Sequence, residues 1–67
     1  MNHLTRREKQ IATLVATGAS NKEIAYQLML SIKTVTNTLT RVFAKTGARG
    51  RTDLAVQIVR ALDRASI

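Results

Sequence analysis

Polar side chains recur on one side of the segment 32–46, at the spacing expected of a helix face. They are Lys33, Asn37, Thr40 and Arg41. Asn can bond adenine at two points, Arg can bond guanine at two points, and Thr can donate, accept or touch a thymine methyl group. The segment therefore predicts a helix that reads base edges in the major groove of DNA, with Thr36 as a further candidate. The alternative is an ordinary solvated helix face.

Basic and polar side chains that suit phosphate contacts lie on both sides of this segment. Ahead of it, Asn21 and Lys22 fall in the first turn of a predicted helix, where free backbone N–H groups and the positive end of the helix favour an anion. At and beyond its far end are Lys45, Arg49 and Arg51. Because phosphate contacts orient a protein while base contacts specify sequence, these groups predict a clamp that sets the register of the reading helix.

The charge of the chain favours a polyanionic partner. Eleven Lys and Arg residues against four Asp and Glu residues give 67 residues a formal net charge of +7 and an isoelectric point near 11.3. Basic ribosomal and membrane-surface peptides usually carry such charge in runs, but the longest run here is Arg6-Arg7. Nucleic acid is therefore the expected partner. No apolar run approaches the ~20 residues of a membrane span and no signal peptide is recognised, so we expect no membrane contact and a cytoplasmic location.

Four helices are predicted to position these residues. Thr5 with Glu8, and Ser20 with Glu23, each form a capping-box pattern in which a hydroxyl residue is followed three residues later by Glu. The predicted helices are 6–17, 21–28, 32–46 and a fourth that starts at Thr52 or Asp53. Short loops and the absence of any strand signal predict an all-α, four-helix bundle that contains a helix-turn-helix, as a single domain over residues 1–67.

Apolar side chains define the inward faces of the last two helices. In the third, the predicted core residues are Ile32, Val35, Leu39, Val42, Phe43 and Thr46. In the fourth, they are Leu54, Ala55, Ile58 and Leu62. Val56 and Val59 project from the other side of the fourth helix, with Thr52 and Asp63 on the same ridge. Because the core of one copy does not need these valines, we expect a two-fold dimer contact there; the alternative is a pair of isolated surface valines.

Other classes of function receive less support. The only histidine is His3, the carboxylates Glu8 and Glu23 have capping roles, and no nucleophile–base pair can be proposed, so no enzyme is expected. Without cysteine or clustered metal ligands, no cofactor or metal is expected either. Two binding alternatives remain: a protein-interaction module that modulates another regulator with weak or no DNA binding, and a sigma-factor region-four module, against which the segment SNKEIA argues.

A resemblance to a known family covers residues 4–59. It rests on LTRREKQIATLVATGASNKEIAYQL, followed by Ser31, Thr34-Val35, Lys45, Gly47 and Arg51. These residues resemble the LuxR-type (GerE-like) helix-turn-helix domain of bacterial transcription regulators, which is often the carboxy-terminal part of a longer regulator and sometimes stands alone. The resemblance implies a four-helix DNA-binding domain whose partners are double-stranded DNA, a second copy of the chain through helix four, and RNA polymerase.

The resemblance also bears on individual positions. The phosphate-binding candidates that match the family are Asn21, Lys22, Thr34 and Lys45. Departures fall in the reading helix, where Thr36 and Thr38 replace the family's usual lysine and histidine, and Thr46 replaces the usual apolar residue before the glycine. Loss of the lysine predicts a lower affinity or an unusual preferred site.

Overall fold

Four α-helices make up the part of the chain that the structure describes. The computed structural model describes the backbone of residues 3–65 and the side chains of residues 3–64. The helices are α1 (Arg6–Ala16), α2 (Asn21–Leu28), α3 (Ile32–Thr46) and α4 (Arg51–Ala65). No strand occurs between residues 3 and 65, and no helix there has the length and apolar character needed to cross a bilayer. The all-α fold with a helix-turn-helix, predicted from the sequence, is confirmed.

Both predicted capping boxes are present. The Thr5 hydroxyl accepts from the N–H of Glu8 at 3.1 Å, and the Glu8 carboxylate accepts from the N–H of Thr5 at 2.8 Å. Ser20 and Glu23 make the same exchange at 3.1 and 2.9 Å. Each box satisfies N–H groups that the first turn of a helix leaves unpaired, so short-range sequence determines where α1 and α2 begin.

The start of α4 differs from the prediction. The helix begins at Arg51 rather than at Thr52 or Asp53. Asp53 lies within the first turn, and its carboxylate accepts a hydrogen bond from the N–H of Arg49 at 2.9 Å. A carboxylate in the first turn can satisfy an N–H group just ahead of the helix and also favours the positive helix end, so Asp53 stabilises the start of α4 without being its cap.

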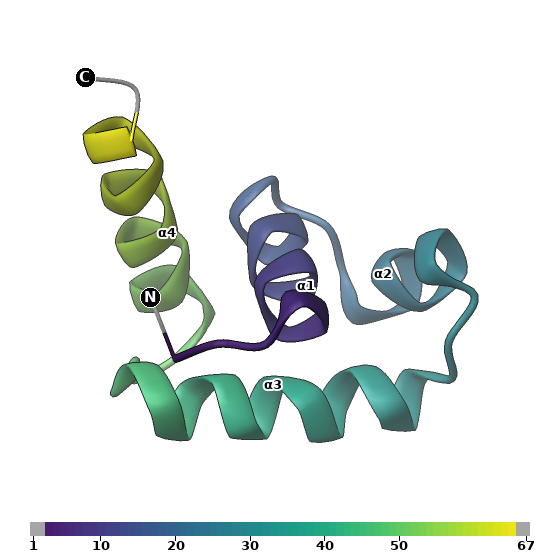
Figure 1. Cartoon of the computed structure of the whole chain (residues 1–67). Coiled ribbons are helices and arrows are strands. Elements are labelled where there is room, and N and C mark those ends of the chain that lie inside the picture. The colour runs from purple at the N-terminus through teal and green to yellow at the C-terminus, as the bar shows by residue number, and fades with distance from the viewer. Residues whose placement is uncertain (1–2, 66–67) are drawn as a thin grey trace.

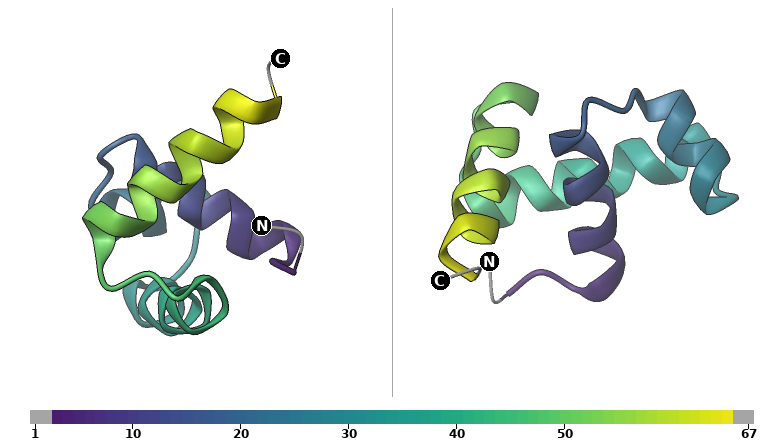
Figure 2. Two further views of the ribbon diagram at one scale, coloured as in Figure 1. Left: turned by 90° about the vertical axis from the view of Figure 1, so that its left-hand side faces the viewer. Right: turned by 90° about the horizontal axis from the view of Figure 1, so that it is seen from above.

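Helix α1 lies at the centre of the fold and packs against the other three helices (Figure 1). Helices α2 and α3 also pack on each other and are joined by the turn of residues 29–31. In Figure 1, α3 runs along the base with α1 and α2 above it, and α4 stands at its carboxy-terminal end. Figure 2 (left) shows α3 nearly end-on. In these views, no other helix of residues 3–65 covers the side of α3 turned away from α1.

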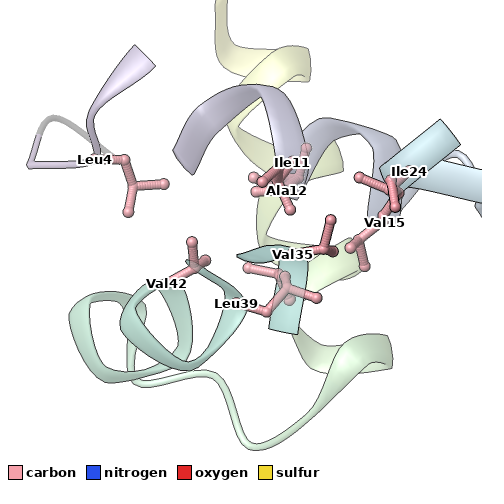
Figure 3. Close-up of a cluster of buried hydrophobic side chains, with 11 residues drawn as sticks. Leu4, Ile11, Ala12, Val15, Ile24, Val35, Leu39 and Val42 are labelled. Carbon is pink, nitrogen blue, oxygen red and sulfur yellow. The ribbon is translucent and has the colours of Figure 1, made fainter. Parts of the chain in front are cut away.

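The hydrophobic core lies where α1 meets its neighbours (Figure 3). The largest fully buried side chains are Ile11, Ile24, Val35, Val42 and Leu54. All four helices are represented in this set, so each helix is held by at least one side chain removed from water. Full burial of such a side chain contributes about 1.5–3 kcal/mol relative to exposure. This packing is what stabilises α2, which with two turns is too short to be stable alone.

Two apolar side chains predicted to be core lie largely outside it. Ile32 is 51% exposed and Leu62 is 55% exposed. Ile32 falls at the edge of the apolar stripe of α3, away from the buried centre at Val35. Leu62 lines an open surface pocket together with Lys9 and Thr13 of α1. The other predicted core residues that are only half-buried are Phe43, Thr46 and Ala55.

Candidate nucleic-acid interface

The outward face of α3 carries the side chains that were predicted to read base edges. All of them are exposed: Lys33, Thr36, Asn37, Thr40 and Arg41. Val35, Leu39 and Val42 are buried on the opposite side, so packing of the core determines which side of α3 faces outward. The result is a polar and basic face on the side of α3 opposite its buried residues; α3 itself runs along the base of Figure 1.

The hydroxyl groups on this face are bonded to the helix backbone. The Thr36 hydroxyl donates to the carbonyl of Ile32 at 2.9 Å, and the Thr40 hydroxyl donates to the carbonyl of Thr36 at 3.1 Å. A hydroxyl that donates in this way has used its only proton but keeps acceptor capacity and a methyl group. Thr36 and Thr40 can therefore accept a hydrogen bond from a base or contact an apolar group, without donating.

Two further threonines of α3 have different surroundings. Thr38 is only 5% exposed, and its hydroxyl donates to the carbonyl of Thr34 at 2.8 Å. Thr38 therefore packs on the core side and does not share the outward face. Thr34 is exposed in the first turn, where its N–H donates to the hydroxyl of Ser31 at 3.0 Å and the two hydroxyl oxygens lie 2.9 Å apart. Thr34 thus belongs to the cap of α3 while keeping an exposed side chain.

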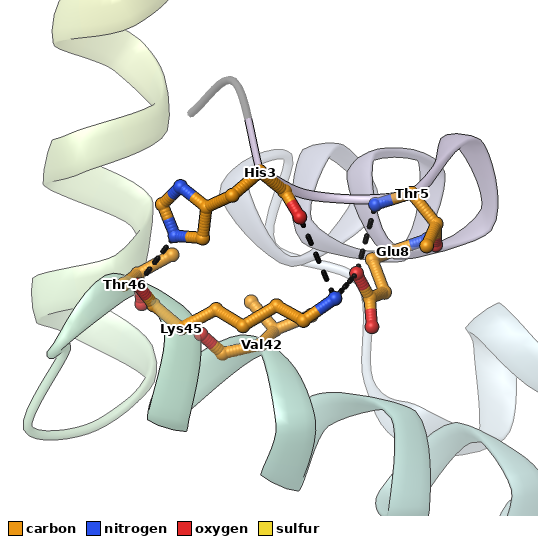
Figure 4. A network of polar contacts seen from close by, with 6 residues as sticks. All are labelled: His3, Thr5, Glu8, Val42, Lys45 and Thr46. Atoms are coloured by element: carbon orange, nitrogen blue, oxygen red, sulfur yellow. Dashed lines mark hydrogen bonds and ion pairs between the residues drawn. The ribbon is translucent and has the colours of Figure 1, made fainter.

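An ion pair that the sequence analysis missed engages Lys45. Its Nζ lies 2.8 Å from Oε1 of Glu8 and joins the end of α3 to the first turn of α1 (Figure 4). The hydrogen bond from Lys45, followed by the bond from the N–H of Thr5, holds the pKa of the Glu8 carboxyl below its usual value. Lys45 Nζ also donates to the carbonyl of His3 at 3.5 Å, and the His3 ring is hydrogen-bonded to the carbonyl of Lys45.

The ion pair with Glu8 gives Lys45 a structural role, which is separate from its predicted contact with phosphate. The two paired residues are 37 positions apart in the chain, and each had a sufficient short-range explanation, Glu8 as a capping residue and Lys45 as a surface cation. No sequence signal linked them. The pair shows that a basic residue near a reading helix can also fasten that helix to the rest of the fold.

Arg51 and Asn21, both predicted to bind phosphate, contact each other. One guanidinium nitrogen of Arg51 donates to Oδ1 of Asn21 at 2.6 Å, and the other donates to the carbonyl of Ala19 at 2.6 Å. These bonds join the start of α4 to the start of α2 and to the loop before it. The guanidinium of Arg51 therefore holds the amino-terminal end of α2 in place, next to Lys22.

Lys22 and Arg49 are the predicted phosphate contacts whose side chains the fold leaves unengaged. Lys22 is exposed in the first turn of α2, and Arg49 is exposed in the loop between α3 and α4. In residues 3–65, neither cation is part of an ion pair, in contrast to Lys45. The ammonium group of Lys22 and the guanidinium group of Arg49 are exposed to water and can contact an anion.

The outer side of α4 exposes the residues that were predicted to form a dimer contact. Val56 is 41% exposed and Val59 is 53% exposed, while Leu54 of the same helix is fully buried. Thr52 and Asp63 are exposed as well. The helix thus presents two valines to solvent, and their contact with a second copy stays a prediction.

Known proteins are similar to this chain in amino-acid sequence. The family model described as bacterial regulatory proteins, luxR family, matches residues 2–58. Over 50 residues the chain is 46% identical to the response regulator Rre1 of Synechocystis sp., covering 75% of this chain and 22% of Rre1. Over 53 residues it is 43% identical to the transcriptional regulatory protein LiaR of Bacillus subtilis, covering 79% of this chain and 25% of LiaR. Over 57 residues it is 37% identical to the spore germination protein GerE of Bacillus subtilis, covering 85% of this chain and 77% of GerE.

The matches cover different shares of the length of each relative. The chain spans about a quarter of the length of Rre1 and LiaR, and about three quarters of GerE. The matched family region contains α1, α2 and α3 entirely and the first half of α4, and so it includes both capping boxes and the outward face of α3. With the family model covering most of its residues and its fold agreeing with the helix-turn-helix prediction, the chain belongs to the luxR family of bacterial regulatory proteins.

Proposed function

We propose that this chain binds double-stranded DNA sequence-specifically in the service of transcription regulation, with α3 in the major groove. The observation that carries the proposal is the outward face of α3, where polar and basic side chains are exposed on a side that no other described helix covers. The major groove admits an α-helix and presents a distinct pattern for each base pair. The names of the relatives Rre1 and LiaR, a response regulator and a transcriptional regulatory protein, support a regulatory role.

Base reading is assigned to side chains according to their chemistry. We assign Asn37, in the middle of the outward face, to an adenine bonded at two points, and Lys33 and Arg41 to guanine. Thr36 and Thr40 act as acceptors or through their methyl groups, because their hydroxyl protons are already bonded to backbone carbonyls. The face therefore combines donors, acceptors and apolar groups, as discrimination among base pairs requires.

Phosphate contact is assigned first to Lys22 and Arg49, whose charged groups the fold leaves unengaged. Lys22 lies beside the free N–H groups at the start of α2, and these groups also favour binding of a phosphate. The remaining candidates are already hydrogen-bonded within the fold and contribute through their further donors: Asn21, Thr34, Lys45 and Arg51. The Arg51–Asn21 bond also joins α4 to α2, and the Lys45–Glu8 pair joins α3 to α1.

Binding to DNA is proposed to involve two copies of the chain. A two-fold contact repeats the same patch on both copies, and Val56 and Val59 provide an exposed apolar patch flanked by Thr52 and Asp63. Two reading helices related in this way match a palindromic site whose half-sites lie about 10 base pairs apart, one turn of the duplex.

Selection from a pool of randomised duplexes tests the proposal. Bound duplexes are recovered, amplified and sequenced, and the affinity for the recovered site is compared with that for a scrambled duplex. We expect a recurring palindromic motif that binds about 10³-fold or more tightly than the scrambled duplex. Thr13→Ala is the matched control, because Thr13 is exposed on α1, and it should recover the same motif. Recovery of no motif, or equal affinity for both duplexes, would contradict the proposal.

A further inference from the structure

Ile32 is a large apolar side chain in a position where the fold gives it little cover. It is the first residue of α3 and is 51% exposed, whereas Val35, one turn later, is fully buried. Single exposed aliphatic side chains are common on protein surfaces and need no explanation by themselves. The residues beside Ile32 on the same face indicate what an exposed isoleucine could contact there.

Ile32, Thr36 and Thr40 form one ridge along α3, because residues four apart lie above one another on a helix. All three are exposed. The Thr36 hydroxyl is bonded to the Ile32 carbonyl and the Thr40 hydroxyl to the Thr36 carbonyl, at 2.9 and 3.1 Å. The ridge therefore offers no hydroxyl proton to a partner, and what it does offer is one aliphatic side chain, two methyl groups and oxygen lone pairs.

A thymine methyl group is the apolar feature that duplex DNA presents in its major groove. The amino-terminal residues of a recognition helix are the ones that contact base edges in helix-turn-helix proteins, and Ile32 occupies the first position of α3. The adjacent Lys33 is exposed and the chain carries a net charge of +7, which favours a polyanion over an apolar protein surface as the partner of this ridge.

We propose that Ile32 is a specificity-determining residue that packs against the 5-methyl group of a thymine in the major groove. The methyl groups of Thr36 and Thr40 extend the same apolar edge toward the next base pairs. The inference rests on the proposed function and adds to it the base that this edge of α3 selects. It also accounts for an isoleucine where burial in the core does not require one.

Replacing thymine by uracil tests the inference, since it removes only the methyl group and keeps base pairing. The duplex recovered by selection is prepared with each thymine of one half-site replaced in turn by deoxyuridine, and binding is followed by fluorescence anisotropy. For the wild-type chain we expect one thymine whose replacement weakens binding about fourfold, the value of one buried methyl group. Ile32→Ala should weaken binding to the thymine duplex and bind the thymine and uracil forms equally.

Lys33→Ala is the matched control, because it removes the neighbouring positive charge and leaves Ile32 unchanged. It should weaken binding to both duplexes and keep the fourfold difference between them. Tolerance of uracil at every position by the wild-type chain, or a fourfold difference that persists in Ile32→Ala, would overturn the inference while leaving DNA recognition intact. Failure of the wild-type chain to prefer any duplex would reject the proposed function, and this inference with it.

Discussion

Replacement of Lys22 by alanine should lower the salt dependence of DNA binding by about one phosphate contact per copy of the chain. The exposed cations that the described fold leaves unpaired and that are assigned to phosphate are Lys22 and Arg49. Each phosphate neutralised contributes about −0.9 to the slope of log affinity against log salt. If each of these two cations meets one phosphate, they contribute about −1.8 to the slope per copy, and Lys22→Ala reduces this contribution to about −0.9.

Lys45→Met is the informative comparison, because Lys45 is already paired with Glu8 at 2.8 Å. Removing it leaves the Glu8 carboxylate, which is 4% exposed, without its cationic partner. We therefore expect Lys45→Met to lower the melting temperature of the chain, since an uncompensated charge near the core is unfavourable. Its effect on the salt slope should be smaller than that of Lys22→Ala.

Fluorescence anisotropy titrations of the recovered duplex between about 50 and about 200 mM salt measure these slopes, and thermal unfolding by circular dichroism measures stability. We expect Lys22→Ala to make the slope shallower without changing the melting temperature, and Lys45→Met to lower the melting temperature with a smaller effect on the slope. A flat salt response of the wild-type chain would refute the reasoning. The reasoning would also be refuted if Lys45→Met made the slope shallower by a full unit while Lys22→Ala left the slope unaltered.

Three other predictions concern the dimer contact, the Glu8 ion pair and the turn between α2 and α3. Val56→Glu places a charge on the exposed side of α4. Sedimentation should therefore show that two chains no longer bind one duplex carrying the full palindromic site. If two chains still bind each duplex, this interface is wrong. Because the pKa of Glu8 is lowered in the folded chain, its stabilisation is present above the pKa of the unfolded carboxyl and is lost as pH falls through the lower folded value. Acid titration of melting temperature should therefore be flatter for Glu8→Gln, and an unchanged profile would show that the pair does not contribute. Met29 is 92% exposed and has a φ of 56°, so Met29→Gly should relieve backbone strain and raise the unfolding free energy in urea by roughly 0.5–1 kcal/mol. A lower unfolding free energy would show that the turn is not strained.

Features set by neighbouring residues could be predicted from the sequence. The Thr5–Glu8 and Ser20–Glu23 capping boxes act over three residues, so the starts of α1 and α2 follow from the sequence alone. The outward face of α3 was predictable for a similar reason, because the spacing of apolar residues along one helix determines which side is buried. Asn37 and its neighbours are exposed, as that spacing requires.

Features set by packing between distant segments could not be predicted. A helical wheel places Ile32 and Leu62 with the apolar residues, but it contains no information on how far the neighbouring helices extend, and both side chains are more than half exposed. The bonds from Lys45 to Glu8 and from Arg51 to Asn21 span 37 and 30 residues. Each partner already had a plausible role in its own surroundings, so only the tertiary structure could bring them together.

The most direct test of α3 as the reading helix compares the wild-type chain with Asn37→Ala on a panel of duplexes. Each duplex differs from the recovered site at one base pair, and affinities are measured at a single salt concentration. We expect Asn37→Ala to lose about 1–3 kcal/mol of binding free energy on the preferred site and to relax the preference at one base pair only. Stability should scarcely change, because Asn37 is exposed and alanine favours helix. Equal weakening on every duplex would contradict a base-reading role for α3 at this position, since Asn37 would then contact only the DNA backbone.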